Sequence, residues 1–142
     1  MHNIRGLFVA EWKLRSCAAY VSAAYSTVDG WQWSRWDELV GAEIGGTVHT
    51  VRTEMLKTGE ITGMALRGED ACRIVIPTSV SLEHQIHIAA HEAWHLIAGH
   101  DGCRRHAAHE NTAERFAGYV GLSVDRRSTP HDHRWYRTVG AS

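Results

Sequence analysis

Residues 81–99 of the 142-residue chain read SLEHQIHIAAHEAWHLIAG, and the fold that we predict is built around this segment. Its apolar residues recur at the spacing of a helix with one buried face. They are Ile86, Ile88 or Ala89, Ala93, Leu96 and Ile97. Ser81 is a residue type that favours the N-cap position, and Gly99 stands where a C-cap glycine is expected. We therefore predict a helix from about Leu82 to Ala98.

An H-E-x-x-H motif, His91-Glu92-Ala93-Trp94-His95, lies inside this predicted helix. Four residues advance a helix by about 6 Å and slightly more than one turn, so both imidazoles leave the same face. Two neutral imidazoles in that arrangement can bind Zn²⁺, and the Glu92 carboxylate beside them can accept a proton from water. The motif is short and also occurs in helices that merely carry two surface histidines. Its position in a helix that follows a strand favours a metal site.

The third metal ligand must come from further along the chain, and several schemes are open. The one we favour takes a carboxylate from Glu110, at the start of the next predicted helix. A metzincin-like pattern would instead place the last ligand at Asp101, although position 98 is alanine where that pattern has glycine. The other candidates are the loop histidines His100, His106 and His109, and the carboxylate of Glu114.

The sequence before this helix predicts a small sheet. Residues 45–77 contain short β-branched runs, bounded by glycine and proline, that are typical of strands. We place strands at 47–52, 61–67 and 71–76, with a hairpin turn at 68–70. Flanking helices are expected at 3–26 and from about Glu110 to Leu122. A short helix is expected to begin at a capping box formed by Ser34 and Asp37 and to end at Gly41.

These elements predict an α+β fold in a single domain, residues 1–142. Its helical N-terminal part would cover about 1–44, its core about 45–124, and a loosely held tail about 125–142. The N-terminal helix would back the sheet, and the H-E-x-x-H helix would pack on it. The Glu110 helix would then complete the site from the other side.

Charge, apolar runs and cysteine content exclude several classes of protein. A net charge of −1 argues against nucleic-acid binding through an overall positive field. No run of about 18 apolar residues predicts a membrane span, and no secretory segment is expected at the start. The three cysteines, Cys17, Cys72 and Cys103, form no C-x-x-C pair, which fits a reducing cytoplasm. We expect a cytoplasmic protein in which Cys103 is a loop thiol.

The second half of the chain resembles the ImmA/IrrE metallopeptidases. The phrase Ile76-Pro77-Thr78, the run from Glu83 to His100, and a later E-x-x-A-x-x-F-A element carry the resemblance, which covers roughly residues 61–122. The last element consists of Glu110, Ala113, Phe116 and Ala117. The resemblance implies a minimal zincin-like domain in which His91, His95 and Glu110 bind zinc and Glu92 is the general base.

The same resemblance implies a zinc-dependent endopeptidase that cleaves a separate protein, typically a transcriptional repressor of a mobile element or stress response. The alternatives are a non-catalytic metal-binding or partner-binding module and a metzincin-like peptidase. A DNA-associated regulator would use the basic tail, but with the whole chain at −1 that tail is better explained as a solvated terminus. Its basic residues are Arg126, Arg127, Arg134 and Arg137.

Two further groups of residues have roles that the sequence leaves open. A hydrolytic site needs a donor for the oxyanion. The downstream candidates are Tyr119, His131, His133 and Tyr136. His84 and His87 lie on the same helical stripe as His91, and we expect them to line the approach to a cleft.

Overall fold

A computed structural model describes residues 10–54, 63–100 and 107–128. The helices are α2 (Glu11–Val21), α3 (Trp33–Ile44), α4 (Leu82–Ile97) and α5 (Ala107–Arg127), with a short 3₁₀ helix, η1, at Ser22–Ala24. The strands are β1 (Tyr25–Ser26), β2 (Gly30–Trp31), β3 (Val48–Thr53), β4 (Met64–Arg67) and β5 (Cys72–Pro77). The described chain is α+β, which confirms the predicted fold class.

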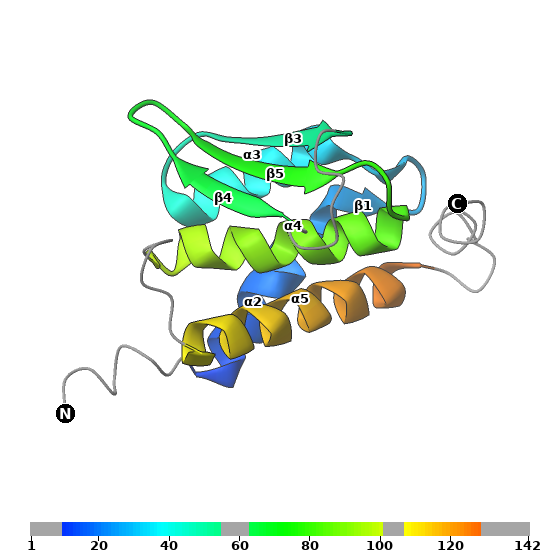
Figure 1. Ribbon diagram of the computed structural model, residues 1–142. Coiled ribbons are helices and arrows are strands. Elements are labelled where there is room, and N and C mark those ends of the chain that lie inside the picture. The colour runs from blue at the N-terminus through cyan, green and yellow to red at the C-terminus, as the bar shows by residue number, and fades with distance from the viewer. Residues whose placement is uncertain (1–9, 55–62, 101–106, 129–142) are drawn as a thin grey trace.

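The elements form layers, with α4 in the middle (Figure 1). The sheet of β3, β5 and β4 lies on one side of α4, and α5 lies on the other side with α2 packed against it. Buried side chains from these elements form one hydrophobic cluster. Helix α4 is therefore covered on two sides, which holds it in a fixed position. None of the described helices is long and apolar enough to cross a membrane.

Strand β5 occupies the centre of the three-stranded sheet. It forms an antiparallel hairpin with β4, in which Arg67 lies opposite Cys72, so the predicted hairpin is confirmed. The N–H of Gly68 donates to the carbonyl of Ala71 at 2.9 Å and closes the turn. Strand β3 pairs with β5 in parallel, an order that the sequence does not indicate. Strand β4 is thus an edge strand, and no described strand pairs with its other side.

Helix α4 agrees closely with the predicted helix because its two ends are encoded locally. The hydroxyl of Ser81 accepts a hydrogen bond from the N–H of His84 at 3.2 Å. At the other end, Gly99 has a φ of +74°, a conformation that glycine adopts without strain. The N–H of His100 reaches the carbonyl of His95 at 2.9 Å, which closes the last turn.

Small side chains let α4 and α5 approach each other. Ala89, Ala90 and Ala93 are fully buried on α4. Beside them the ring of Trp94 packs on Phe116 of α5, with 5.0 Å between the ring centroids. The close packing of these two helices brings the start of α5 to the H-E-x-x-H turn of α4.

The N-terminal helix is shorter than predicted, and it packs on α5 instead of backing the sheet as expected. Its described part, α2, ends at Val21, where the prediction continues to residue 26. The chain then passes through η1 into a small antiparallel hairpin, β1–β2, in which Gly30 has a φ of +74°. The predicted residues before position 10 lie outside the described part of the chain.

The predicted limits of α3 are wrong at its C-terminal end. The helix continues past Gly41 to Ile44 and ends at Gly45, whose φ is +80°. A side chain at Gly41 would have its Cβ only 2.6 Å from the carbonyl oxygen of Gly46, so Gly41 permits a close backbone approach. The expected capping box at Ser34 is absent too, since the N-cap is Gln32 and makes no side-chain cap.

The last described helix is longer than predicted. Helix α5 begins at Ala107 and continues through residues 125–127, which were expected in a loose tail. The guanidinium of Arg127 donates to the hydroxyl of Ser22 at 3.0 Å and to the carbonyl of Ala19 at 3.1 Å. These bonds attach the end of α5 to the end of α2.

Candidate metal centre

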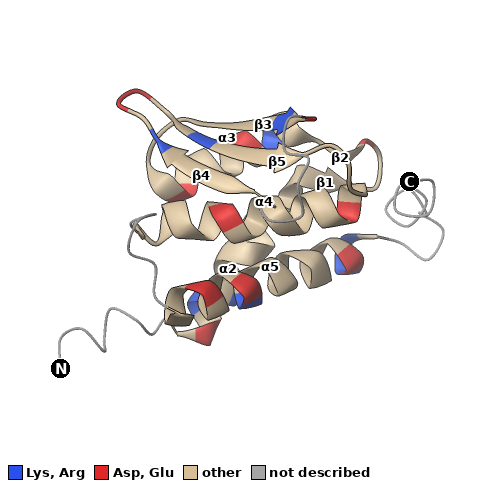
Figure 2. Cartoon of the chain, viewed as in Figure 1, with Lys and Arg blue, Asp and Glu red and all other residues tan. Residues whose placement is uncertain are grey.

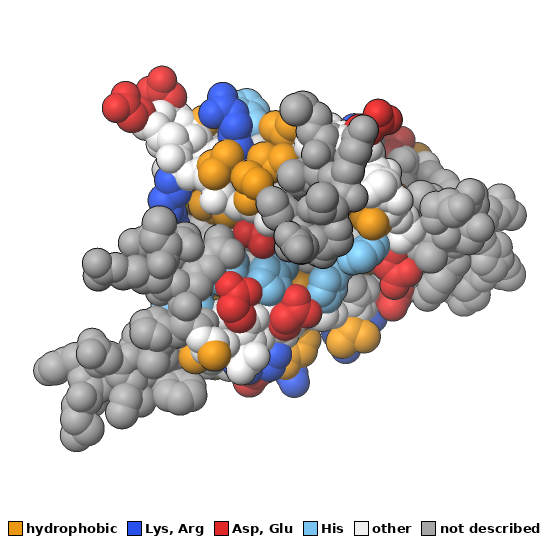
Figure 3. Space-filling view, in the orientation of Figure 1, with side chains coloured by type: hydrophobic (Ala, Val, Ile, Leu, Met, Phe, Trp, Pro, Cys, Tyr) orange, Lys and Arg blue, Asp and Glu red, His pale blue; other side chains and the backbone are white. Residues whose placement is uncertain are grey.

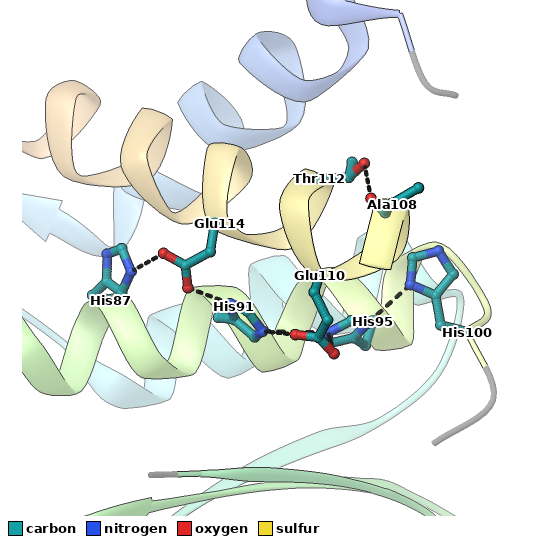
Figure 4. A network of polar contacts seen from close by, with 8 residues as sticks. All are labelled: His87, His91, His95, His100, Ala108, Glu110, Thr112 and Glu114. Carbon is teal, nitrogen blue, oxygen red and sulfur yellow. Dashed lines mark hydrogen bonds and ion pairs between the residues drawn. The ribbon is translucent and has the colours of Figure 1, made fainter. Parts of the chain in front are cut away.

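Helices α4 and α5 bring His91, His95 and Glu110 together (Figure 4). One ligand atom from each residue lies within 4.8 Å of those of the other two. The Nε2 atoms of His91 and His95 are 3.4 Å apart, and His95 Nε2 lies 3.3 Å from Glu110 Oε1. The sequence-predicted ligands thus converge, although they come from two helices separated by a loop.

These distances fit a tetrahedral metal ion. Zinc with bond lengths of about 2.0–2.1 Å holds its ligand atoms about 3.4 Å apart. Two of the measured separations match that value. The third, between His91 Nε2 and Glu110 Oε2, is 2.7 Å, and a small rotation of the half-exposed Glu110 side chain would lengthen it. Among the described residues, two imidazoles and one carboxylate leave a fourth position open, and three protein ligands are the number found in catalytic rather than structural zinc sites.

The site is buried at one end and open at the other. The His95 side chain is 1% exposed and that of Glu110 is 42% exposed. A cavity of about 450 Å³ opens beside His91 and Glu110. It is lined by His84, His87, Ile88, His91, Glu92, Glu110 and Glu114. The expected position of His84 and His87 beside the approach to the site is confirmed.

The same face of the molecule gathers histidine and acidic side chains. Figure 3 shows histidines in a band below the sheet, with acidic side chains next to them. Each strand of the larger sheet carries an arginine, while acidic residues occur along α4 and α5 (Figure 2). A cation would therefore be attracted to this band.

Glu92 lines the cavity from inside the fold. It is 6% exposed and follows the ligand His91 on α4. Gly63, just before β4, packs directly against this part of the helix. A Cβ at Gly63 would lie 2.4 Å from Ile88 Cγ2 and 3.5 Å from Glu92 Cγ. The edge of the sheet thus limits how the Glu92 side chain can move.

Glu114, an alternative ligand in the sequence analysis, contacts the other nitrogen of His91. Its Oε1 lies 2.6 Å from His91 Nδ1, and its Oε2 lies 3.1 Å from His87 Nε2. Partial burial raises the pKa of Glu114, but the hydrogen bonds and charges of His87 and His91 outweigh burial and hold this pKa below its ordinary value. Glu114 is thus placed behind a ligand and outside the cluster of three.

The remaining candidate ligands are placed differently or lie outside the described residues. His100 Nδ1 is 2.9 Å from His95 Nδ1, the nitrogen that faces away from Glu110, and the His100 ring stacks on His109 with centroids 3.6 Å apart. Both histidines therefore stand behind His95. Asp101, Cys103 and His106 belong to the undescribed segment 101–106.

Tyr119 does not point to the three ligands. Its hydroxyl donates to the carboxylate of Glu11 on α2, and Arg15 lies over its ring. That hydrogen bond is the main reason why the pKa of Glu11 is lowered. The other expected oxyanion donors, His131, His133 and Tyr136, lie outside the described residues.

Sequence reasoning missed two contacts around the site. One is the link from His87 through Glu114 to His91, which the spacing of four residues on both helices could have indicated. The other joins β4 to α4, the helix that carries the H-E-x-x-H motif. The guanidinium of Arg67 donates to the carbonyl of Leu96 at 2.8 Å, near the C-terminal end of α4. No pattern in the sequence indicates this second contact.

Comparison with known proteins gives no relative for this chain: no family model, no curated protein and no solved structure matches it.

Proposed function

We propose that this chain is a zinc-dependent endopeptidase with a zincin-like fold, similar in its site to the ImmA/IrrE metallopeptidases. One observation carries the proposal. His91, His95 and Glu110 bring their ligand atoms within 4.8 Å of one another, with two of the three separations at tetrahedral spacing, beside a cavity that Glu92 also lines. A site built only to hold a metal would need no such carboxylate and would favour four protein ligands.

Each residue then has a defined task. Zinc bound there would act as a Lewis acid, lowering the pKa of water toward 7 and polarising a peptide carbonyl. Glu92 accepts a proton from the water molecule while the oxygen of that water bonds to the carbonyl carbon of the peptide. It returns a proton to the amide nitrogen as the C–N bond breaks, so one residue acts as base and then as acid.

The edge strand β4 offers a binding mode for an extended substrate. No described strand pairs with its outer side, and the chain just before it contacts Glu92 through Gly63. A peptide that adds to a free sheet edge gains main-chain hydrogen bonds without depending on its side chains. A substrate bound in this way would pass beside the proton acceptor.

For the substrate, we propose a separate repressor-type DNA-binding protein in the cytoplasm. This part of the proposal rests on the resemblance seen in the sequence. The acidic and histidine-rich surface around the cavity supports a protein substrate rather than a nucleic acid, because carboxylates repel phosphates.

The test compares the wild type with Glu92→Gln. Each is co-expressed with repressors encoded beside its gene, and repressor length is followed on a gel. A general base contributes about 10²–10⁴-fold to the rate, so Glu92→Gln should retain zinc yet cleave almost nothing. Glu83→Gln makes the same chemical change in the first turn of α4 and should cleave normally. Relief of repression without cleavage, equal in wild type and Glu92→Gln, would show that the chain acts by binding instead.

A further inference from the structure

The two imidazoles of the proposed metal site are supported by different partners. Behind His91 stands a carboxylate, Glu114, at 2.6 Å from Nδ1. Behind His95 stands another imidazole, His100, at 2.9 Å from Nδ1. Figure 4 shows both partners on the side of the rings away from Glu110. The groups that contact the two Nδ1 atoms therefore differ in chemistry: a carboxylate at His91 and an imidazole at His95.

We propose that Glu114 is a positioning residue that fixes the tautomer and ring orientation of His91, and that His87 in turn holds Glu114. The inference rests on the proposed metal site, because it assigns Glu114 a role toward one of its ligands.

The hydrogen-bonding chemistry of the groups supports this assignment. An ionised carboxylate can only accept hydrogen bonds, so the nitrogen that faces Glu114 must donate. Nε2 faces the other carboxylate, Glu110, at 2.7 Å, and a metal bound between them would take the place of any proton on Nε2. A neutral imidazole has one N–H, and with that proton on Nδ1 the lone pair is on Nε2. Nε2 is the atom that lies at tetrahedral spacing from His95 and close to Glu110. Glu114 thus makes the correct nitrogen of His91 available to the metal.

The second oxygen of Glu114 explains the position of His87. Oε2 lies 3.1 Å from His87 Nε2, so the carboxylate is held at both oxygens by imidazoles one turn apart on α4. A carboxylate held at two points keeps one rotamer and one distance from His91. We infer that His87 contributes indirectly, through Glu114.

The location of Glu114 argues against a role in folding. Its side chain is 57% exposed, and it precedes the buried core position Phe116 without being part of it. Carboxylates behind ligating histidines typically affect metal affinity by about 10–100-fold when they are mutated. Removing the Glu114 carboxylate should therefore weaken zinc binding and leave the fold intact.

The experiment measures zinc affinity by competition with a chromophoric chelator. We expect Glu114→Gln to weaken binding by about 10–100-fold and His87→Ala to weaken it less, because His87 acts only through Glu114. Glu83→Gln is the matched control, with the same change of charge two turns before His91, and should bind like the wild type. Glu114→Asp keeps the charge but shortens the side chain, so it should fall between Glu114→Gln and the wild type.

A second readout reports the tautomer directly. In ¹⁵N spectra of the zinc-loaded protein, the Nδ1–H signal of His91 should shift or broaden in Glu114→Gln while that of His95 stays in place. Wild-type affinity in Glu114→Gln would overturn the inference, and so would complete loss of zinc, because that result would make Glu114 a ligand. If the wild type itself binds no zinc, the proposed function is wrong. If the wild type binds zinc and Glu114→Gln binds it equally well, only the role of Glu114 is wrong.

Discussion

Replacing Gly63 with alanine should displace part of α4 without altering any of the proposed metal ligands. The added Cβ would lie 2.4 Å from Ile88 Cγ2 and 3.3 Å from the carbonyl oxygen of Val75. Carbon atoms pack at about 3.5–4.0 Å, so the helix and the chain before β4 must separate by roughly 1 Å. Overpacking of this kind costs about 1–3 kcal/mol of unfolding free energy.

The same displacement should reach Glu92, the proposed general base. Glu92 lies one helical turn after Ile88 on α4, and its Cγ would be 3.5 Å from the new Cβ. A misplacement of about 1 Å in an active site can cost about 10²-fold in rate. We therefore expect Gly63→Ala to lose activity by about that factor while it still binds zinc, because none of the three atoms nearest to the added Cβ belongs to His91, His95 or Glu110.

Urea unfolding of the metal-free protein measures the change in stability, and peptide cleavage measures the change in rate. Gly118→Ala is the control, since a Cβ at this helical position of α5 meets no atom within 4 Å. That variant should gain up to about 1 kcal/mol, because alanine has the higher helix propensity. If Gly63→Ala is as stable and as active as the wild type, the packing of β4 on Glu92 is not as described.

Two further predictions concern the supports of the site and the N-terminal helix. Arg67→Met should lower the unfolding free energy by about 1 kcal/mol, because it removes a charged donor from the C-terminal end of α4, whereas Arg73→Met on the same sheet should have little effect in the same urea assay. Burial, and then the nearby charge of Glu43, raises the pKa of Cys17 to about 12, while an unfolded thiol titrates near about 8.5. Unfolding should therefore release a proton between these values, so stability is unaffected below about pH 8 and falls as the pH rises above it. A urea midpoint that drops from pH 7 to pH 10 as much in Cys17→Ala as in the wild type would contradict this assignment.

The helix that carries the H-E-x-x-H motif could be predicted because its signals are local. Ser81 caps one end, Gly99 closes the other, and the apolar spacing between them marks the buried face. The convergence of His91 with His95 follows from helix geometry alone. The fold class and the β4–β5 hairpin are confirmed for the same reason, since short-range turn and strand signals define them.

The parts that could not be predicted depend on contacts between distant residues. Gly41 resembles a helix terminator in the sequence, yet it lies within α3 because the backbone of Gly46 approaches it. Asp37, expected in a cap, instead accepts hydrogen bonds from the N–H and hydroxyl of Thr50 on β3, at 3.0 and 2.6 Å. Neither contact leaves a pattern in the local sequence.

The candidate site too could be predicted from local sequence only in part. The sequence favours Glu110 among the candidates for the third ligand but does not exclude the others, because the choice depends on how α5 packs against α4. In the structure that packing puts Glu110 beside both Nε2 atoms and Glu114 one turn later, behind His91. A difference of four residues along one helix thus separates a candidate ligand from a positioning residue.

The central claim is that His91, His95 and Glu110 bind one zinc ion, and metal analysis tests it most directly. Protein purified without chelator is analysed for metal content, and metal-free protein is then titrated with zinc while thermal unfolding is followed. We predict one zinc per wild-type chain and a stabilisation of about 4 kcal/mol at zinc concentrations 1,000-fold above the dissociation constant. His91→Ala, His95→Ala and Glu110→Gln should lose both the stoichiometric zinc and the stabilisation. A wild-type protein that binds no zinc, or variants that retain it in full, would contradict the account.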